Sequence, residues 1–233
     1  MDIKKKLKEI AREFDLKYES KNKFKSLVLT KREIVIRVFL CGCPDPLMVK
    51  YGNKIKNQRG KNLIKYLNTE DYKKEVDNPQ GCVVSREELK TELNLISGIP
   101  DIKLKRETEK IYSKIKRKMG KSDRLTLIWK PSKEEEQSEQ RSEILLHEFI
   151  HELLEDNGIR LKSWKWNEGL VTYITNQAVE KLYRFKEEPK LKQHPMWNIY
   201  ATYTRKWIKL LEKVDNPKKR KQAILKKVRK IRK

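Results

Sequence analysis

Two histidines four residues apart constrain the fold of this chain more than any other feature. His147 and His151 flank Glu148 in the pattern His-Glu-x-x-His, inside a stretch whose apolar spacing predicts a helix. Side chains four residues apart on a helix project from the same face, one turn from each other. Two imidazoles in that arrangement can bind one metal ion. The chain must therefore fold so that this helix presents both imidazoles to the same point.

A zinc site that performs hydrolysis commonly has three protein ligands and one open position. Sixteen residues separate His151 from Glu168, which begins a second segment with helical spacing. Antiparallel packing of the two helices would aim the Glu168 carboxylate at the imidazoles. Glu148 follows the first histidine directly, so it flanks the metal instead of binding it. A carboxylate there can accept a proton from water and later deliver it to a leaving amine.

The alternative interpretation is a surface helix on which two histidines fall four apart by coincidence. The chain has only three histidines, and two of them are in this motif. Apolar residues surround it, namely Ile144, Leu145, Phe149, Ile150, Leu153 and Leu154. A helix buried on most sides needs polar partners for its imidazoles and carboxylate, and a metal ion meets that need. The sequence therefore favours one zinc ion held by His147, His151 and Glu168.

These motifs resemble those of the gluzincin metallopeptidases, whose members include aminopeptidases with an Asn-Glu-Gly third-ligand motif. The second motif here reads Asn-Glu-Gly at 167–169, and the resemblance covers roughly residues 125–183. It implies a zinc-dependent peptidase acting on a protein or peptide substrate. The two histidines and Glu168 would bind the metal, and Glu148 would be the general base.

The resemblance leaves two supporting roles open. Thermolysin-like members have an aspartate four residues after the ligand glutamate, whereas this chain has Thr172, and the gap between the motifs is slightly shorter than in the better-known members. The partner of the first histidine is therefore unidentified. In gluzincins a protonated histidine or a tyrosine steadies the oxyanion, and the candidates here are His194, Tyr173, Tyr200 and Tyr203.

The chain carries a net charge of +24, which predicts contact with polyanions or acidic surfaces. The alternative is a lysine-rich surface that is simply solvated. Residues 216–233 hold ten lysines and arginines and no acidic residue. Within them, helical spacing is kept by Ile224, Leu225, Val228 and Ile231. This segment is either a basic helix that meets nucleic acid or a membrane surface, or a frayed, solvated tail.

Three cysteines, an odd number, do not make a disulfide framework. Cys41-Gly42-Cys43-Pro44-Asp45 resembles the cysteine switch of matrix metalloproteinase propeptides, with Cys41 as the zinc ligand, but a strand end before a proline turn is favoured. A separate zinc site from Cys41, Cys43 and Cys82 lacks a clear fourth ligand.

The N-terminus has no signal-peptide run and no stretch is apolar enough to span a membrane, so a cytoplasmic protein is expected.

The periodicities predict an α+β fold that is mostly helical with a small sheet. Helices are expected at residues 2–15, 62–76, 85–96 and 104–119, a β-hairpin at 24–38 around Lys31-Arg32, and a strand at 124–130 that could pair with substrate. The expected division is an N-terminal region, 1–100, that gates a cleft or binds a partner, a zincin-like catalytic region, 101–215, and a basic tail, 216–233.

The sequence therefore predicts a zinc metallopeptidase, with two alternatives. One is a nucleic-acid-associated metalloprotease, similar in role to the SprT-like enzymes. The other is a non-catalytic basic binding protein that keeps a vestigial metal site. The oligomeric state is left open.

Overall fold

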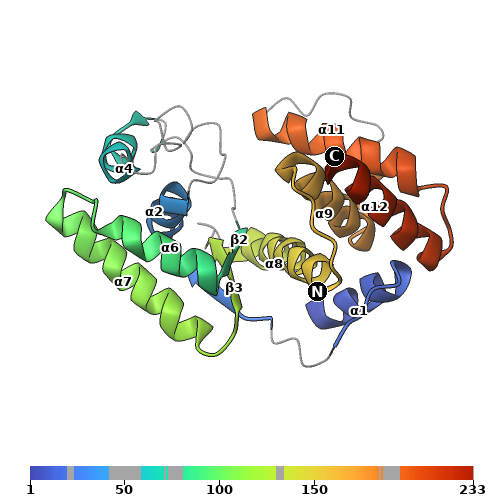
Figure 1. The fold of residues 1–233 in the computed structure, drawn as a ribbon, viewed down its shortest axis with the longest axis horizontal. Helices are drawn as coiled ribbons and strands as arrows, with labels where there is room; N and C mark the ends of the chain where they lie inside the picture. The colour runs from blue at the N-terminus through green and yellow to red at the C-terminus, as the bar shows by residue number, and fades with distance from the viewer. Residues whose placement is uncertain are drawn as a thin grey trace. The chain divides into compact units, whose positions relative to one another are not determined.

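The computed structural model describes residues 1–19, 24–41, 59–70, 72, 81–129, 134–183, 185 and 195–232. These residues form a mostly helical structure with one small sheet, which confirms the α+β prediction (Figure 1). The chain divides into two compact units. The first unit contains residues 1–22 and 145–233, and the second contains residues 23–144. Along the described part of the chain, no helix has the length and apolar character needed to cross a membrane.

The second unit is built on three strands. β1 (Ser26–Leu29) pairs in parallel with β3 (Arg124–Trp129), and β2 (Gly81–Ser85) pairs with β3 antiparallel, so the order is β1-β3-β2. The helices are α2 (Lys31–Cys41), α4 (Arg59–Leu67), α6 (Arg86–Ile96) and α7 (Ile102–Met119). Their apolar faces form one core with the sheet. The helix expected at residues 62–76 matches α4 over residues 62–67, and residues 71 and 73–76 lie outside the described part of the chain.

β3 occupies the middle of this sheet, so the prediction that it pairs with substrate is wrong. Thr126 to Trp129 are in register with β1, and Arg124 to Ile128 are in register with β2. Its backbone donors and acceptors are therefore used on both sides. A substrate segment can be added only to a strand with an open edge.

The predicted β-hairpin at 24–38 is also wrong, because its second half is the helix α2. The sequence signal for this helix lies at its start, where Thr30 and Glu33 form a reciprocal cap. The Thr30 backbone N–H donates to the Glu33 carboxylate at 2.8 Å, and the Glu33 N–H donates to the Thr30 hydroxyl at 3.2 Å. Cys41 therefore ends a helix and not a strand, and Cys43 lies outside the described residues.

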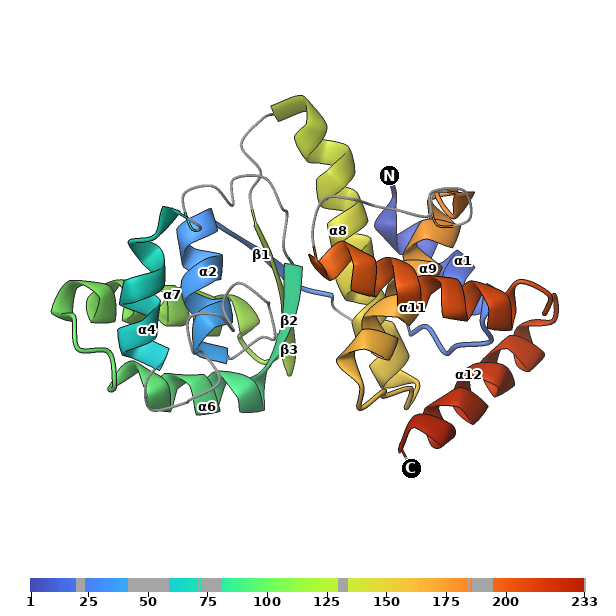
Figure 2. The same ribbon diagram turned by 90° about the horizontal axis from the view of Figure 1, so that it is seen from above.

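The regular elements described in the first unit are all helices. It contains α1 (Ile3–Glu13), the C-terminal part of α8 (Glu134–Asp156), α9 (Trp164–Ala178), α11 (Pro195–Leu211) and α12 (Pro217–Arg232). Figure 2 shows α9 and α11 side by side. The turn after α8 uses Gly158 at φ 71°, a left-handed conformation that glycine adopts without strain. The Asn157 side chain also exchanges hydrogen bonds with the Lys17 backbone, which ties this turn to the segment after α1.

The C-terminal segment is a docked helix, so a frayed tail is excluded. Ile224 is fully buried in α12 and Val228 is 3% exposed. Lys221 donates a hydrogen bond to the Asp15 carbonyl oxygen at 2.7 Å, which holds α12 against the end of α1. The basic segment therefore belongs to the first unit instead of forming a separate region.

The expected boundary near residue 100 does not coincide with the division into two units. Hydrogen bonding between β1 and β3 places residues 26–29 and 124–129 in one sheet. The helix α1, at the other end of the first hundred residues, packs with the C-terminal helices instead. Both associations join segments more than ninety residues apart, and local composition gives no sign of them.

Candidate metal centre

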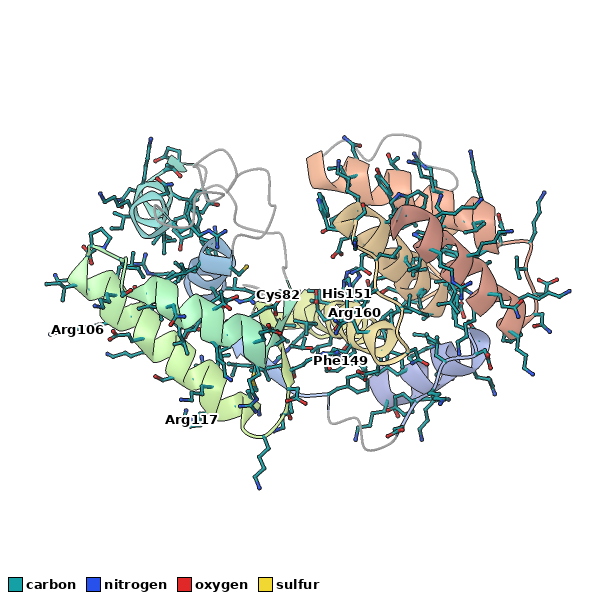
Figure 3. All side chains as sticks on the ribbon, viewed as in Figure 1. Cys82, Arg106, Arg117, Phe149, His151 and Arg160 are labelled. Atoms are coloured by element: carbon teal, nitrogen blue, oxygen red, sulfur yellow. The ribbon has the colours of Figure 1, made fainter. Side chains whose placement is uncertain are left out.

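Three side chains meet between α8 and α9 of the first unit. The Nε2 atom of His147 lies 3.2 Å from Oε2 of Glu168, and the Nε2 atom of His151 lies 3.4 Å from Oε1. One potential ligand atom from each residue falls within 4.8 Å of the others. The two rings are 5.1 Å apart between centroids, one turn from each other along α8, and Figure 3 labels His151 there. The structure thus brings together the three residues predicted as ligands.

These residues fit a zinc ion by both chemistry and spacing. Two imidazole nitrogens and a carboxylate oxygen are a common ligand set for catalytic zinc. Bond lengths near 2.1 Å in a tetrahedral site place neighbouring ligand atoms about 3.4 Å apart. The nitrogen-to-oxygen distances of 3.2 and 3.4 Å match that spacing. The side chains of His147, His151 and Glu168 are 22%, 15% and 22% exposed, so the centre is sheltered but reachable from solvent.

The electrostatics of the cluster favour an ionised Glu168. Burial alone would raise the pKa of this carboxyl, because it removes the charged form from water. The charge of His151 and hydrogen bonds from both imidazoles outweigh burial, and they hold the pKa of Glu168 far below its usual value. The surroundings of Glu168 therefore favour the charged carboxylate, which is the form that binds a metal.

Asn167 orients the second histidine, a role that the sequence analysis did not assign. The side-chain nitrogen Nδ2 of Asn167 lies 3.1 Å from Nδ1 of His151. When Nε2 of a histidine binds a metal, Nδ1 carries the hydrogen and needs an acceptor. A half-turn of the Asn167 amide presents its oxygen to that hydrogen. The signal in the sequence was the position of Asn167 directly before Glu168.

Within the described residues, no hydrogen bond reaches Nδ1 of His147. Thr172 lies one turn after Glu168 on α9 and is 7% exposed. It occupies the position where thermolysin-like gluzincins carry an aspartate. Asn167 therefore supports the ring of His151, whereas the position that would supply a carboxylate to His147 holds a threonine.

No family model, curated protein or solved structure matches this chain. The assignment of the centre therefore depends on its own residues and their geometry.

Glu148 occupies the position expected of a general base. It follows His147 directly on α8 and precedes His151 by three residues, a separation at which side chains are neighbours on the surface of a helix. It is only 7% exposed. A carboxylate so deep in the fold is rare unless polar groups surround it or it has a function.

The four candidates for the oxyanion donor are placed differently. Tyr173 is 2% exposed and meets Phe14 of α1 edge to face, with ring centroids 6.3 Å apart. Five residues after Glu168, it projects from another side of α9. The Tyr203 ring packs edge to face on Trp166. Tyr200 is half-buried on α11, and His194 lies outside the described residues. Tyr173 belongs to the α1–α9 core, and the Tyr203 ring is packed on Trp166. Tyr200 is therefore the tyrosine that we consider as the oxyanion donor.

The cysteines do not form a second metal site among the described residues. The Sγ atom of Cys82, on β2, accepts a hydrogen bond from the Arg37 guanidinium at 3.1 Å (Cys82 is labelled in Figure 3). A guanidinium at that distance disfavours a metal cation on the same sulfur, because like charges repel. Neither Cys41 nor Cys82 forms a disulfide.

A close crossing of α9 and α11 fixes the start of the helix that carries Glu168. Gly169 lies against α11, and a carbon added there would be 2.5 Å from Cβ of Tyr203 and 2.8 Å from its carbonyl carbon. On the same side, Trp207 donates from its indole nitrogen to the carbonyl oxygen of Trp166 at 3.0 Å. These contacts order the residues on either side of Glu168.

The Gly169→Ala variant is therefore expected to lower the free energy of unfolding by about 1–3 kcal/mol, because the added methyl group forces the two helices apart. Chemical denaturation measures this loss. Gly98→Ala is the matched control, since its added carbon approaches no atom closer than 3.4 Å. Equal stability of the two variants would contradict the close crossing.

Proposed function

We propose that this protein is a zinc-dependent metallopeptidase of the gluzincin type that acts on a protein or peptide substrate. The observation that carries the proposal is the convergence of His147, His151 and Glu168 from two helices of one unit. Three protein ligands of these types leave a fourth position for solvent or substrate, which is typical of zinc sites that catalyse hydrolysis.

When bound, zinc supplies Lewis-acid chemistry, lowering the pKa of water and polarising a carbonyl group. The residues of the chain do the rest. Glu148 accepts the proton of the attacking water and later donates it to the leaving amine. Asn167 holds the His151 ring in the orientation that ligation requires. Tyr200 is proposed to donate a hydrogen bond to the oxyanion.

The main alternative is a non-catalytic binding protein with a vestigial metal site. One feature weighs against it. The three ligand side chains keep the spacing of a tetrahedral site, which a binding protein without a metal does not require.

The Glu168→Gln variant tests the ligand assignment. It is expected to raise the Kd for zinc at least about a hundredfold, because it removes the only negative ligand; changes to residues that merely support ligands already cost 10- to 100-fold. Competition with a chromophoric chelator measures the affinity. Glu155→Gln, an exposed position on α8, removes the same charge and should bind zinc as the wild type does. A wild-type protein that takes up no zinc, or a Glu168→Gln variant with unchanged affinity, overturns the proposal.

A nucleic-acid-associated peptidase is the second candidate. The specific observation in its favour is the outward face of α12, which lies in the same unit as the metal centre.

A further inference from the structure

Helix α12 divides its residues sharply between two faces. Its inward face carries the buried Ile224 and Val228. Basic residues on that side also have structural partners. The Arg220 guanidinium lies over the Phe14 ring at 5.7 Å, and the Lys227 ammonium lies 4.1 Å from the centroid of Trp166. The inward basic residues are therefore explained by packing against α1 and α9.

The outward face has no such explanation. It carries five exposed basic residues, Lys218, Lys219, Lys226, Arg229 and Lys230. No acidic residue occurs between 216 and 233, and within the described residues no carboxylate pairs with any of the five. Like charges gathered on one face repel each other, so the face costs stability unless an anionic partner covers it. We call these five residues the α12 basic face.

We propose that the α12 basic face binds the phosphate backbone of a nucleic-acid duplex. The face extends over twelve residue steps from 218 to 230, which is about 18 Å along a helix. Phosphates on one strand of a duplex follow each other every 3.4 Å along the axis, so about five of them fit within that length. Five cations can thus meet phosphates with little change in either partner. Such contacts position a protein on the backbone without reading its sequence.

A membrane surface is the rival partner, and the arrangement of α12 disfavours it. A helix that lies in a membrane interface inserts an exposed apolar face among the lipids. In α12 the apolar face is used inside the protein, with Ile224 at 0% and Val228 at 3% exposure. Only charge is left to contact the bilayer. A duplex, by contrast, requires charge alone.

Binding of a blunt 20-base-pair DNA duplex by the full-length protein tests the proposal, with fluorescence anisotropy measured at several salt concentrations. Replacing all five residues of the α12 basic face by glutamine is expected to weaken binding at least tenfold. The negative slope of log K against log salt should become less steep by about 4.5, since each of the five phosphate contacts contributes about 0.9.

A matched control comes from α7, in the second unit, where five exposed basic residues are also available: Lys103, Arg106, Lys110, Lys116 and Arg117. Figure 3 labels two of them, Arg106 and Arg117. Changing these to glutamine removes the same charge, and the variant should keep nearly all of its duplex affinity. Equal losses from the two sets of substitutions would show that net charge alone attracts DNA, and they would overturn the proposal.

A second measurement on the unmodified protein guards against a variant that folds poorly. Acylation of lysine amines is followed by mass spectrometry with and without the duplex. Protection of Lys218, Lys219, Lys226 and Lys230, but not of Lys103 and Lys110, supports the proposal. Uniform protection, or protection by phosphatidylserine vesicles with none by the duplex, contradicts it. Zinc uptake is a separate assay, so failure of the peptidase proposal and failure of this one can be told apart.

Discussion

The Glu148→Gln variant is expected to keep its zinc and to lose hydrolysis of peptide substrates by about a thousandfold, within the 10²–10⁴ range of general acid–base catalysis. Glutamine has nearly the shape of glutamate but cannot accept a proton at neutral pH. Because Glu148 is not one of the three convergent ligands, its change should leave the metal in place.

Two readouts separate this role from a structural one. Metal analysis after gel filtration should give the same zinc content for the variant and the wild type. The measured kcat should fall while KM changes little, because substrate binding does not use the lost proton acceptor. Glu155→Gln, on the same helix but exposed, should retain activity. Turnover like that of the wild type would remove Glu148 from the mechanism.

The metal centre could be predicted from the sequence because its determinants are local. Residues four apart lie on the same face of any helix, which places His147 and His151 together. The Asn-Glu-Gly motif lies near the start of the next helix along the chain. Short-range signals also located α6, where Ser85 and Glu88 form a capping box, and α7, which ends before Gly120 at φ 56°. Whether the centre holds zinc stays a prediction.

The failures come from interactions that act over long distances. Alternation of apolar residues in 34–38 predicted a strand, but α2 is buried on nearly all sides, so helical periodicity is erased. The capping pair Thr30 and Glu33 was the better local signal. The central place of β3 depends on pairing with β1, whose residues are 100 positions away, and no local pattern encodes it.

Arg37 illustrates the same limit. A single arginine inside an apolar run indicates a buried cation that needs a partner, but the sequence does not say which acid supplies it. The structure identifies Glu92. Two hydrogen bonds join the Arg37 guanidinium to the Glu92 carboxylate, at 2.9 and 3.3 Å, and the Tyr112 hydroxyl donates to the same carboxylate at 2.8 Å. Both charged residues are 3% exposed.

Replacing Arg37 by methionine is therefore expected to lower the free energy of unfolding by about 3–5 kcal/mol, because it leaves the Glu92 carboxylate buried without its cation. Equilibrium denaturation in urea measures the change. Arg32→Gln is the contrasting control. It removes a pair of similar geometry with Glu107, at 2.7 Å, whose side chains are 46% and 35% exposed, and it should cost at most about 1 kcal/mol.

The free energy of unfolding that is lost in Arg37→Met should also depend on pH. Burial is the largest influence on Glu92 and raises its pKa, while the charge of Arg37 lowers it. Removing Arg37 therefore raises this pKa further. A carboxyl whose pKa is higher in the folded state destabilises the fold when ionised, and this penalty disappears as the pH falls and the group takes up its proton. The difference between variant and wild type should thus be larger at pH 7 than at pH 5. A difference that is constant between these pH values, or that grows toward pH 5, would show that the cost of the substitution comes from lost packing and not from an uncompensated charge on Glu92.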